Sequence, residues 1–224
     1  MPVIQHAHHP FDPRAASQFL ANLDTDWARL VAQVGPCRHQ TQPGQEPYEA
    51  LMRAVAHQQL HGKAAEAILG RLLAMQPGQT FPSPAQLLGT EPEQLRACGF
   101  SQRKVETLRA IAMGAQSGLI PSRAEAATLD DETLIERLTT LPGIGRWTVE
   151  ILLIYSLERP DILPVDDFGV REGYRHLKSL PKQPGPRALA RIAEAWSPYR
   201  TAAAWYLWRV VEQPDYRRAP KPAT

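Results

Sequence analysis

The chain has 224 residues, of which 43% are hydrophobic, and its formal net charge is only +2. It contains no run of about 18 apolar residues and no basic segment followed by an apolar one at the N-terminus, so neither a membrane span nor a secretory signal is predicted, and we expect a cytoplasmic protein. The two cysteines, Cys37 and Cys98, are expected to be buried thiols, and they are too few for a four-cysteine iron–sulfur cluster.

Helical periodicity dominates the chain. Between Glu49 and Met75 apolar residues recur at helical spacing, and only His57–Gln59 and Gly62 interrupt the stripe. Further helices are predicted for residues 86–98, 104–117, 148–157, 186–196 and 202–212. Because no segment alternates as a strand does, an all-α fold is predicted. The first ten residues and residues 217–224 are expected to be tails.

The stretch Leu141–Thr148 places two glycines between two predicted helices. Asp130 and Asp131 can cap the first helix, Pro142–Gly143 ends it, and the second begins near Gly145. Glycines let a backbone approach a ligand closely, and the first amides of a helix are unpaired donors at its positive end. The turn therefore suits a phosphate, although an isolated turn of this kind is also compatible with an ordinary connection between helices.

Five segments of the chain resemble motifs of a known protein family. Leu141–Thr148 matches the hairpin of the helix-hairpin-helix (HhH-GPD) DNA glycosylases, and Leu163–Val170 matches the segment that holds their catalytic aspartate. Weaker matches are Ala56–Leu60, Gly99–Lys104 and Trp196–Thr201. In order and spacing the chain most resembles the alkylpurine branch of this superfamily, the 3-methyladenine DNA glycosylase II type, over about residues 45–212.

The resemblance implies a fold of two helical lobes with the active-site cleft between them. The central lobe is expected at residues 48–159, and residues 1–47 and 160–224 are expected to form the second lobe. With only about 47 residues ahead of the central lobe, the N-terminal β-domain of some family members is not expected. The implied partner is double-stranded DNA that carries alkylated bases, the expected state is a monomer, and no membrane partner is expected.

The resemblance assigns the catalytic carboxylate to Asp167. A fixed carboxylate stabilises the positive charge that develops on the sugar as the base departs, and it can orient or deprotonate the attacking water. Asp166 is the alternative, and either aspartate could instead cap the following helix. The implied reaction is hydrolysis of the N-glycosidic bond of 3-methyladenine or 7-methylguanine in base excision repair.

A flipped base needs an aromatic pocket, for which the resemblance indicates Trp147 and Trp208. Aromatic faces attract cations, and N-alkylated purines are cationic. The tyrosine that the family has one turn after Trp147 is Ile151 here, and Tyr155 lies one turn further on. The other two tryptophans of the C-terminal region, Trp196 and Trp205, are expected to pack in the core.

Contacts with DNA are implied for two segments. The hairpin would contribute Gly143, Gly145 and Thr148, and the loop that probes the duplex would contribute Gln58, Gln59 and Leu60. Gln59 falls at the wedge position and Leu60 follows it, so either could fill the gap left by the flipped base. The alternative is a polar kink in one long helix from Glu49 to Met75.

No cofactor is expected to be required, although the resemblance implies Na⁺ or K⁺ on the backbone carbonyls of Thr139, Leu141 and Ile144. The lyase branch has a lysine where this chain has Trp147, so a monofunctional enzyme is predicted. The alternatives are a bifunctional glycosylase/lyase, which Trp147 and the cysteine count disfavour, and a non-catalytic damage-binding module, which Asp167 and the two pocket tryptophans disfavour.

Overall fold

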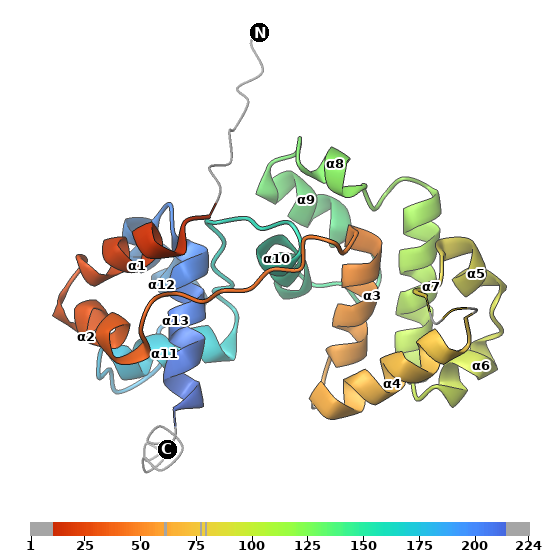
Figure 1. Ribbon diagram of the computed structural model, residues 1–224, viewed down its shortest axis with the longest axis horizontal. Helices are drawn as coiled ribbons and strands as arrows, with labels where there is room; N and C mark the ends of the chain where they lie inside the picture. The colour runs from red at the N-terminus through yellow and green to blue at the C-terminus, as the bar shows by residue number, and fades with distance from the viewer. Residues whose placement is uncertain (1–10, 61, 77, 79, 214–224) are drawn as a thin grey trace, which may run out of the picture. The chain divides into compact units, whose positions relative to one another are not determined.

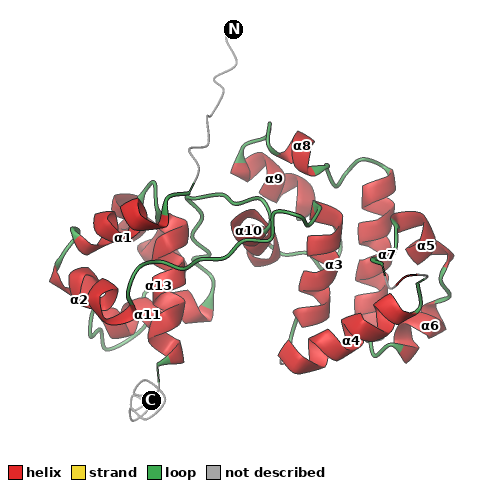
Figure 2. Cartoon of the chain, in the orientation of Figure 1, coloured by secondary structure: helices red, strands yellow, loops and turns green. Residues whose placement is uncertain are grey.

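The computed structural model describes residues 11–60, 62–76, 78 and 80–213, and both predicted tails lie outside these residues. Every regular element in the described part of the chain is a helix, as Figure 2 shows, which confirms the predicted all-α class. The chain divides into two compact units. Unit 1 comprises Gln42–Leu157, and unit 2 comprises the described residues 11–41 and 158–213, so the divisions fall a few residues from the expected 48 and 159.

Unit 1 contains eight of the described helices (Figure 1). They are α3 (Pro47–His57), α4 (Gly62–Ala74), α5 (Pro84–Gly89), α6 (Pro92–Ala97), α7 (Gln102–Gln116), α8 (Arg123–Ala126), α9 (Asp131–Leu138) and α10 (Arg146–Tyr155). Helix α7 packs against α3, α5 and α6, and α10 packs against α3 and α9. Leu51, Val55, Leu108 and Leu153 are each 0% exposed, so these helices share a closed apolar core.

Unit 2 is built around α13 (Arg200–Glu212). The other helices of this unit are α1 (Pro13–Ala21), α2 (Thr25–Val34), α11 (Phe168–Leu177), α12 (Pro186–Ile192) and the short 3₁₀ helix η2 (Ala193–Trp196). Helices α1, α2 and α11 all pack on α13, and α11 approaches it so closely that a Cβ on Gly173 would lie 2.2 Å from the carbonyl oxygen of Leu207. Trp196 and Trp205 are only 3% and 8% exposed, which confirms their predicted core positions.

Local signals explain where the helices begin and end. Ser101 caps α7 by accepting a hydrogen bond from the Lys104 amide, so this helix begins at Gln102, two residues before the expected residue 104. The expected helix 86–98 is two helices, because Pro92 begins a new first turn at α6. The alternative of one continuous helix from Glu49 to Met75 is wrong, because α3 ends at His57 and α4 begins at Gly62.

Both cysteines are free and buried, as predicted. Burial raises the pKa of the Cys37 thiol to about 11, and it also raises the pKa of Cys98. No helix among the described residues is both long enough and apolar enough to span a bilayer.

Candidate functional site

The predicted turn between two helices joins α9 to α10 in unit 1. Gly143 has a φ of +81°, which is the left-handed region that favours glycine. A Cβ on Gly143 would lie 2.2 Å from the Thr107 Oγ1 on α7, whereas a Cβ on Gly145 would meet nothing within 4 Å. The packing of unit 1 therefore requires Gly143 to be a glycine, while the backbone around Gly145 is open to an approaching ligand.

Arg146 holds the two helices of this hairpin together. Its guanidinium pairs with Glu132 Oε1 on α9 at 2.5 Å and with Glu150 Oε1 on α10 at 3.0 Å. The hydrogen bond with Glu132 raises the pKa of Arg146, and the same bond lowers the pKa of Glu132. The pair with Glu132 is exposed on both sides and contributes little to global stability, whereas the Glu150 side chain is only 4% exposed, so Arg146 compensates the charge of a buried carboxylate.

At the start of α10, neighbouring side chains face opposite ways, one toward the surface and the next toward the core. Trp147 is 41% exposed, whereas Thr148 is 3% exposed and its amide donates to the Gly145 carbonyl. Thr148 lies at the third position of α10, and its side chain faces the core beside Val149, so its contact with DNA stays a prediction. Ile151 and Tyr155, both half-buried, follow Trp147 at four-residue intervals and share its side of the helix.

The predicted probe loop, Gln58–Leu60, follows the C-terminus of α3, so the alternative of a kink within one helix does not hold. The Gln58 Nε2 donates to the Gly143 carbonyl at 3.3 Å, which joins this loop to the hairpin. Gln59 has a φ of +58° and is exposed, and Leu60 is 40% exposed although it is apolar. The loop therefore presents two side chains to the exterior of unit 1.

Lys104 contacts the backbone of the probe loop, a role that the sequence analysis did not assign to it. Its Nζ donates to the carbonyl oxygens of Ala56 at 2.9 Å and Gln58 at 2.8 Å, at the start of the probe loop. Burial lowers the pKa of this lysine. The Gly99–Lys104 segment pointed to the start of α7, but a contact 46 residues away in the chain leaves no signal in the sequence.

Asp167 is the N-cap of α11 in unit 2. Its Oδ1 accepts hydrogen bonds from the Val170 amide at 2.8 Å and from the Trp208 Nε1 on α13 at 2.9 Å. Asp166 is exposed and is not the cap of this helix, so the capping role considered for Asp166 is wrong. The predicted catalytic aspartate is thus the one whose carboxylate two donors orient.

Two further residues shape this part of unit 2. A Cβ on Gly169 would lie 2.9 Å from the Trp208 Cδ1 and 3.1 Å from the Asp167 Oδ1, so only glycine allows the indole to lie so close to the carboxylate. Phe168, which the sequence analysis did not single out, is 64% exposed beside Asp167. The signal in the sequence was an aromatic residue directly after two consecutive aspartates.

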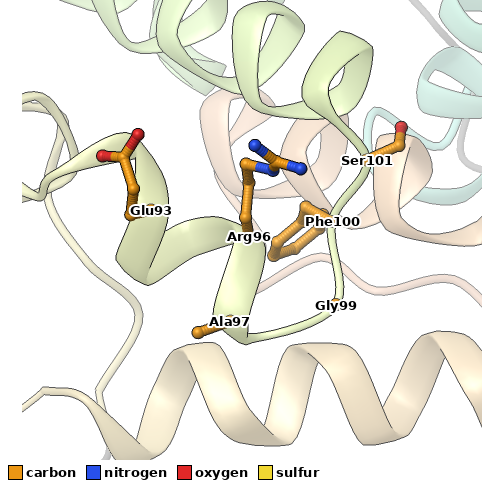
Figure 3. A pocket seen from close by; sticks show the side chains of 6 residues that line it. All are labelled: Glu93, Arg96, Ala97, Gly99, Phe100 and Ser101. Atoms are coloured by element: carbon orange, nitrogen blue, oxygen red, sulfur yellow. The ribbon is translucent and has the colours of Figure 1, made fainter.

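A hollow of about 540 Å³ lies near the start of α7 (Figure 3). Its lining residues are Glu93, Arg96, Ala97, Gly99, Phe100 and Ser101. Figure 3 shows the Arg96 guanidinium and the Phe100 ring beside the turn that leads into α7. This hollow does not include the probe loop or the hairpin. Among the described residues, no group of three or more His, Cys, Asp or Glu side chains could hold a metal ion.

The hairpin and the aspartate segment together occur in a known family. Residues 52–198 match the HhH-GPD superfamily of base excision DNA repair proteins. The chain belongs to this superfamily. Among the relatives of this HhH-GPD protein, DNA-3-methyladenine glycosylase 1 of Schizosaccharomyces pombe is 49% identical over 204 residues, which are 91% of this chain and 90% of the relative. The alkylbase DNA glycosidase-like protein mag2 of the same organism is 34% identical over 89% of this chain and 94% of its own length.

Solved structures of HhH-GPD proteins have the same fold. The S. pombe 3-methyladenine DNA glycosylase Mag1, solved in complex with abasic DNA, superposes with a TM-score of 0.82 at 49% identity and covers 90% of this chain and 98% of Mag1. A DNA-3-methyladenine glycosidase from Bacillus halodurans gives a TM-score of 0.78 at 32% identity, with 90% and 91% of the two chains covered. The all-α HhH-GPD fold predicted from the sequence is therefore confirmed.

Proposed function

We propose that this HhH-GPD protein is a monofunctional DNA glycosylase that excises alkylated purines from duplex DNA. The observation that carries the proposal is the Asp167 carboxylate, oriented by Val170 and Trp208 at the position where the superfamily places its catalytic aspartate. The 49% identity to an S. pombe relative named as a DNA-3-methyladenine glycosylase supports the choice of substrate.

The chemistry follows from the charge of Asp167. As the N-glycosidic bond breaks, its electron pair leaves with the base, and positive charge develops on the deoxyribose. A carboxylate that is already oriented stabilises that charge without reorganising during the reaction. Water then adds to C1′ and gives up a proton, which the Asp167 carboxylate can accept. The products are the free base and an abasic site in an intact strand.

Trp147 argues against lyase chemistry. A lyase needs a lysine amine to form a Schiff base with the sugar, and this chain has an indole at the corresponding position of α10. The exposed face of Trp147, with Ile151 and Tyr155 along the same side of the helix, suits stacking on a base. In unit 2, Trp208 supplies a second aromatic surface, while its Nε1 is engaged with Asp167.

Substrate selection would then depend on charge more than on hydrogen bonds to the edge of the base. A cationic 3-methyladenine or 7-methylguanine is attracted to aromatic faces, at about 0.5–2 kcal/mol for each contact, and it is already a good leaving group. Such a base needs no general acid to depart, which agrees with a site built around one carboxylate.

The hairpin would bind the DNA backbone. Helix α10 begins directly after Gly145, where the positive end of the helix dipole favours a phosphate. Backbone carbonyls are suitable ligands for Na⁺ or K⁺, and those of Thr139, Leu141 and Ile144 belong to the same turn. The Leu141 carbonyl accepts a hydrogen bond from the Ile144 amide at 3.1 Å, and a carbonyl oxygen has a second lone pair for a cation.

The deciding experiment measures base release from duplexes that each carry one modified base. We expect 3-methyladenine and 7-methylguanine to be released much faster than neutral hypoxanthine, and we expect the strand to break only after alkali treatment. Borohydride trapping of a protein–DNA adduct, or a preference for oxidised pyrimidines, would assign the chain to the lyase branch instead.

A further inference from the structure

Lys104 lies where α3 ends and the probe loop, Gln58–Leu60, begins. The last carbonyl groups of any helix have no partner within the helix. Here the Lys104 Nζ satisfies two carbonyl oxygens at this end, those of Ala56 at 2.9 Å and Gln58 at 2.8 Å. Both bonds are charge-assisted, and such bonds are stronger than bonds between neutral groups. One ammonium on α7 therefore anchors the backbone at the entrance to the loop.

The loop conformation needs such an anchor. Gln59 has a φ of +58°, a conformation that residues other than glycine keep only when the surroundings hold it. The Gln58 side chain supplies a second anchor through its 3.3 Å bond to the Gly143 carbonyl. Between these anchors and α4, the side chains of Gln59 and Leu60 project outward instead of joining the core.

We propose that Lys104 is a positioning residue that holds the probe loop ready to enter the duplex, so that Gln59 and Leu60 can fill the gap beside a missing or flipped base. The inference rests on the proposed function. The physical reason is preorganisation, because a loop that is ordered before binding loses less conformational entropy when it inserts. Lys104 does not touch the substrate in this role, so its effect should be confined to DNA that has a gap to fill.

Arg109 provides a matched comparison. It also lies on α7, and its Nη1 donates to the carbonyl oxygens of Leu88 at 3.3 Å and Thr90 at 3.2 Å, at the end of α5. Lys104 and Arg109 therefore make the same kind of contact from the same helix, but only Lys104 does so at the probe loop. If the contact serves stability alone, the two residues should behave alike.

The test compares binding of the full chain to two fluorescent duplexes that differ only in one tetrahydrofuran abasic-site analogue. We expect the wild type to prefer the abasic duplex. Lys104→Met, which keeps the apolar stem but loses both bonds, should reduce that preference on the order of tenfold while leaving affinity for the undamaged duplex nearly unchanged. Arg109→Met should keep the preference, and Lys104→Arg, which can still donate to both carbonyls, should restore most of it.

Thermal unfolding of each variant shows whether the losses of stability are comparable. If Lys104→Met does not fold, Lys104→Gln, whose side chain is shorter and uncharged, replaces it. An unchanged preference in the lysine variants, an equal loss in Arg109→Met, or an equal loss on both duplexes would overturn the assignment, as would a wild type without any preference. Release of 7-methylguanine by the wild type, measured separately, tests the proposed function independently of these results.

Discussion

The Trp208 Nε1 donates a hydrogen bond of 2.9 Å to the Asp167 Oδ1, across 41 residues of sequence. The bond gives the indole two separable roles, because its edge orients the carboxylate while its face remains an aromatic surface. Gly169 makes this geometry possible, since any Cβ there would lie 2.9 Å from the indole Cδ1. A tryptophan expected only as part of a base pocket is thus also bonded to the carboxylate that is predicted to be catalytic.

Replacing Asp167 by asparagine should abolish most base release. Asparagine keeps an oxygen that can accept from Val170 and Trp208, so we expect folding and DNA binding to persist. Loss of the negative charge should lower the single-turnover rate by at least about a hundredfold. Asp166→Asn, at an exposed neighbouring position, is the control and should remain close to wild type. A dead Asp166→Asn with an active Asp167→Asn would show that the catalytic register is wrong by one residue.

Trp208→Phe separates the two roles of the indole. Phenylalanine keeps an aromatic face but has no N–H, so the carboxylate loses one of its orienting donors. We expect kcat to fall by about tenfold with KM little changed, whereas Trp208→Ala, which also loses the face, should slow release of cationic bases by about one to two orders of magnitude. Wild-type kcat in Trp208→Phe would mean that only the ring surface matters.

The two hairpin glycines should respond differently to alanine. In Gly145→Ala the new Cβ meets no neighbouring atom, so the free energy of unfolding should change by about 1 kcal/mol or less. The same Cβ would obstruct the approach of a phosphate, so affinity should fall equally for damaged and undamaged duplex. Gly143→Ala should cost more stability, because it combines left-handed strain of about 1–2 kcal/mol with a collision at Thr107. Adding Thr107→Ala should recover part of that loss. If the affinity of Gly145→Ala for DNA is unchanged at several salt concentrations, the hairpin does not bind the DNA backbone and serves only as a turn between two helices.

The Cys37 thiol should be chemically inert in the folded protein. Burial raises its pKa to about 11, so at pH 8.5 it stays protonated, and its thiolate fraction becomes substantial only as the pH approaches that value. In a Cys98→Ala background, alkylation by iodoacetamide at pH 8.5 should be at least about tenfold slower than in denaturant, and the rate should rise steeply between pH 9 and 11. Rapid labelling at pH 8.5 without denaturant would show that this side chain is not buried as described.

Hydrophobic periodicity and local turn chemistry predicted much of the molecule. The start of α7 to within two residues, the hairpin glycines, the helix that follows them and the core positions of Trp196 and Trp205 all follow from patterns within a few residues. The helices α1 and α2 were missed, although Asp12 and Asp24 carry the capping signal and accept from backbone amides at both helix starts. Periodicity alone also left open a single helix in place of α3 and α4, because the apolar stripe continues from one into the other.

By itself, the sequence determined what could be decided within one or two turns of backbone: the helical class, the glycine turn, and an aspartate followed by a helix. Only the tertiary structure decided which distant groups meet. Lys104 bonds to a carbonyl 46 residues away, Gln58 to one 85 residues away, and Trp208 to an aspartate 41 residues away. The same packing turns Thr148 into the core and leaves its neighbour Trp147 exposed. These contacts could not be predicted for a physical reason. Periodicity and capping act between near neighbours in the chain, whereas these contacts depend on how each unit packs its helices. Many sequences satisfy the same packing without a shared local pattern.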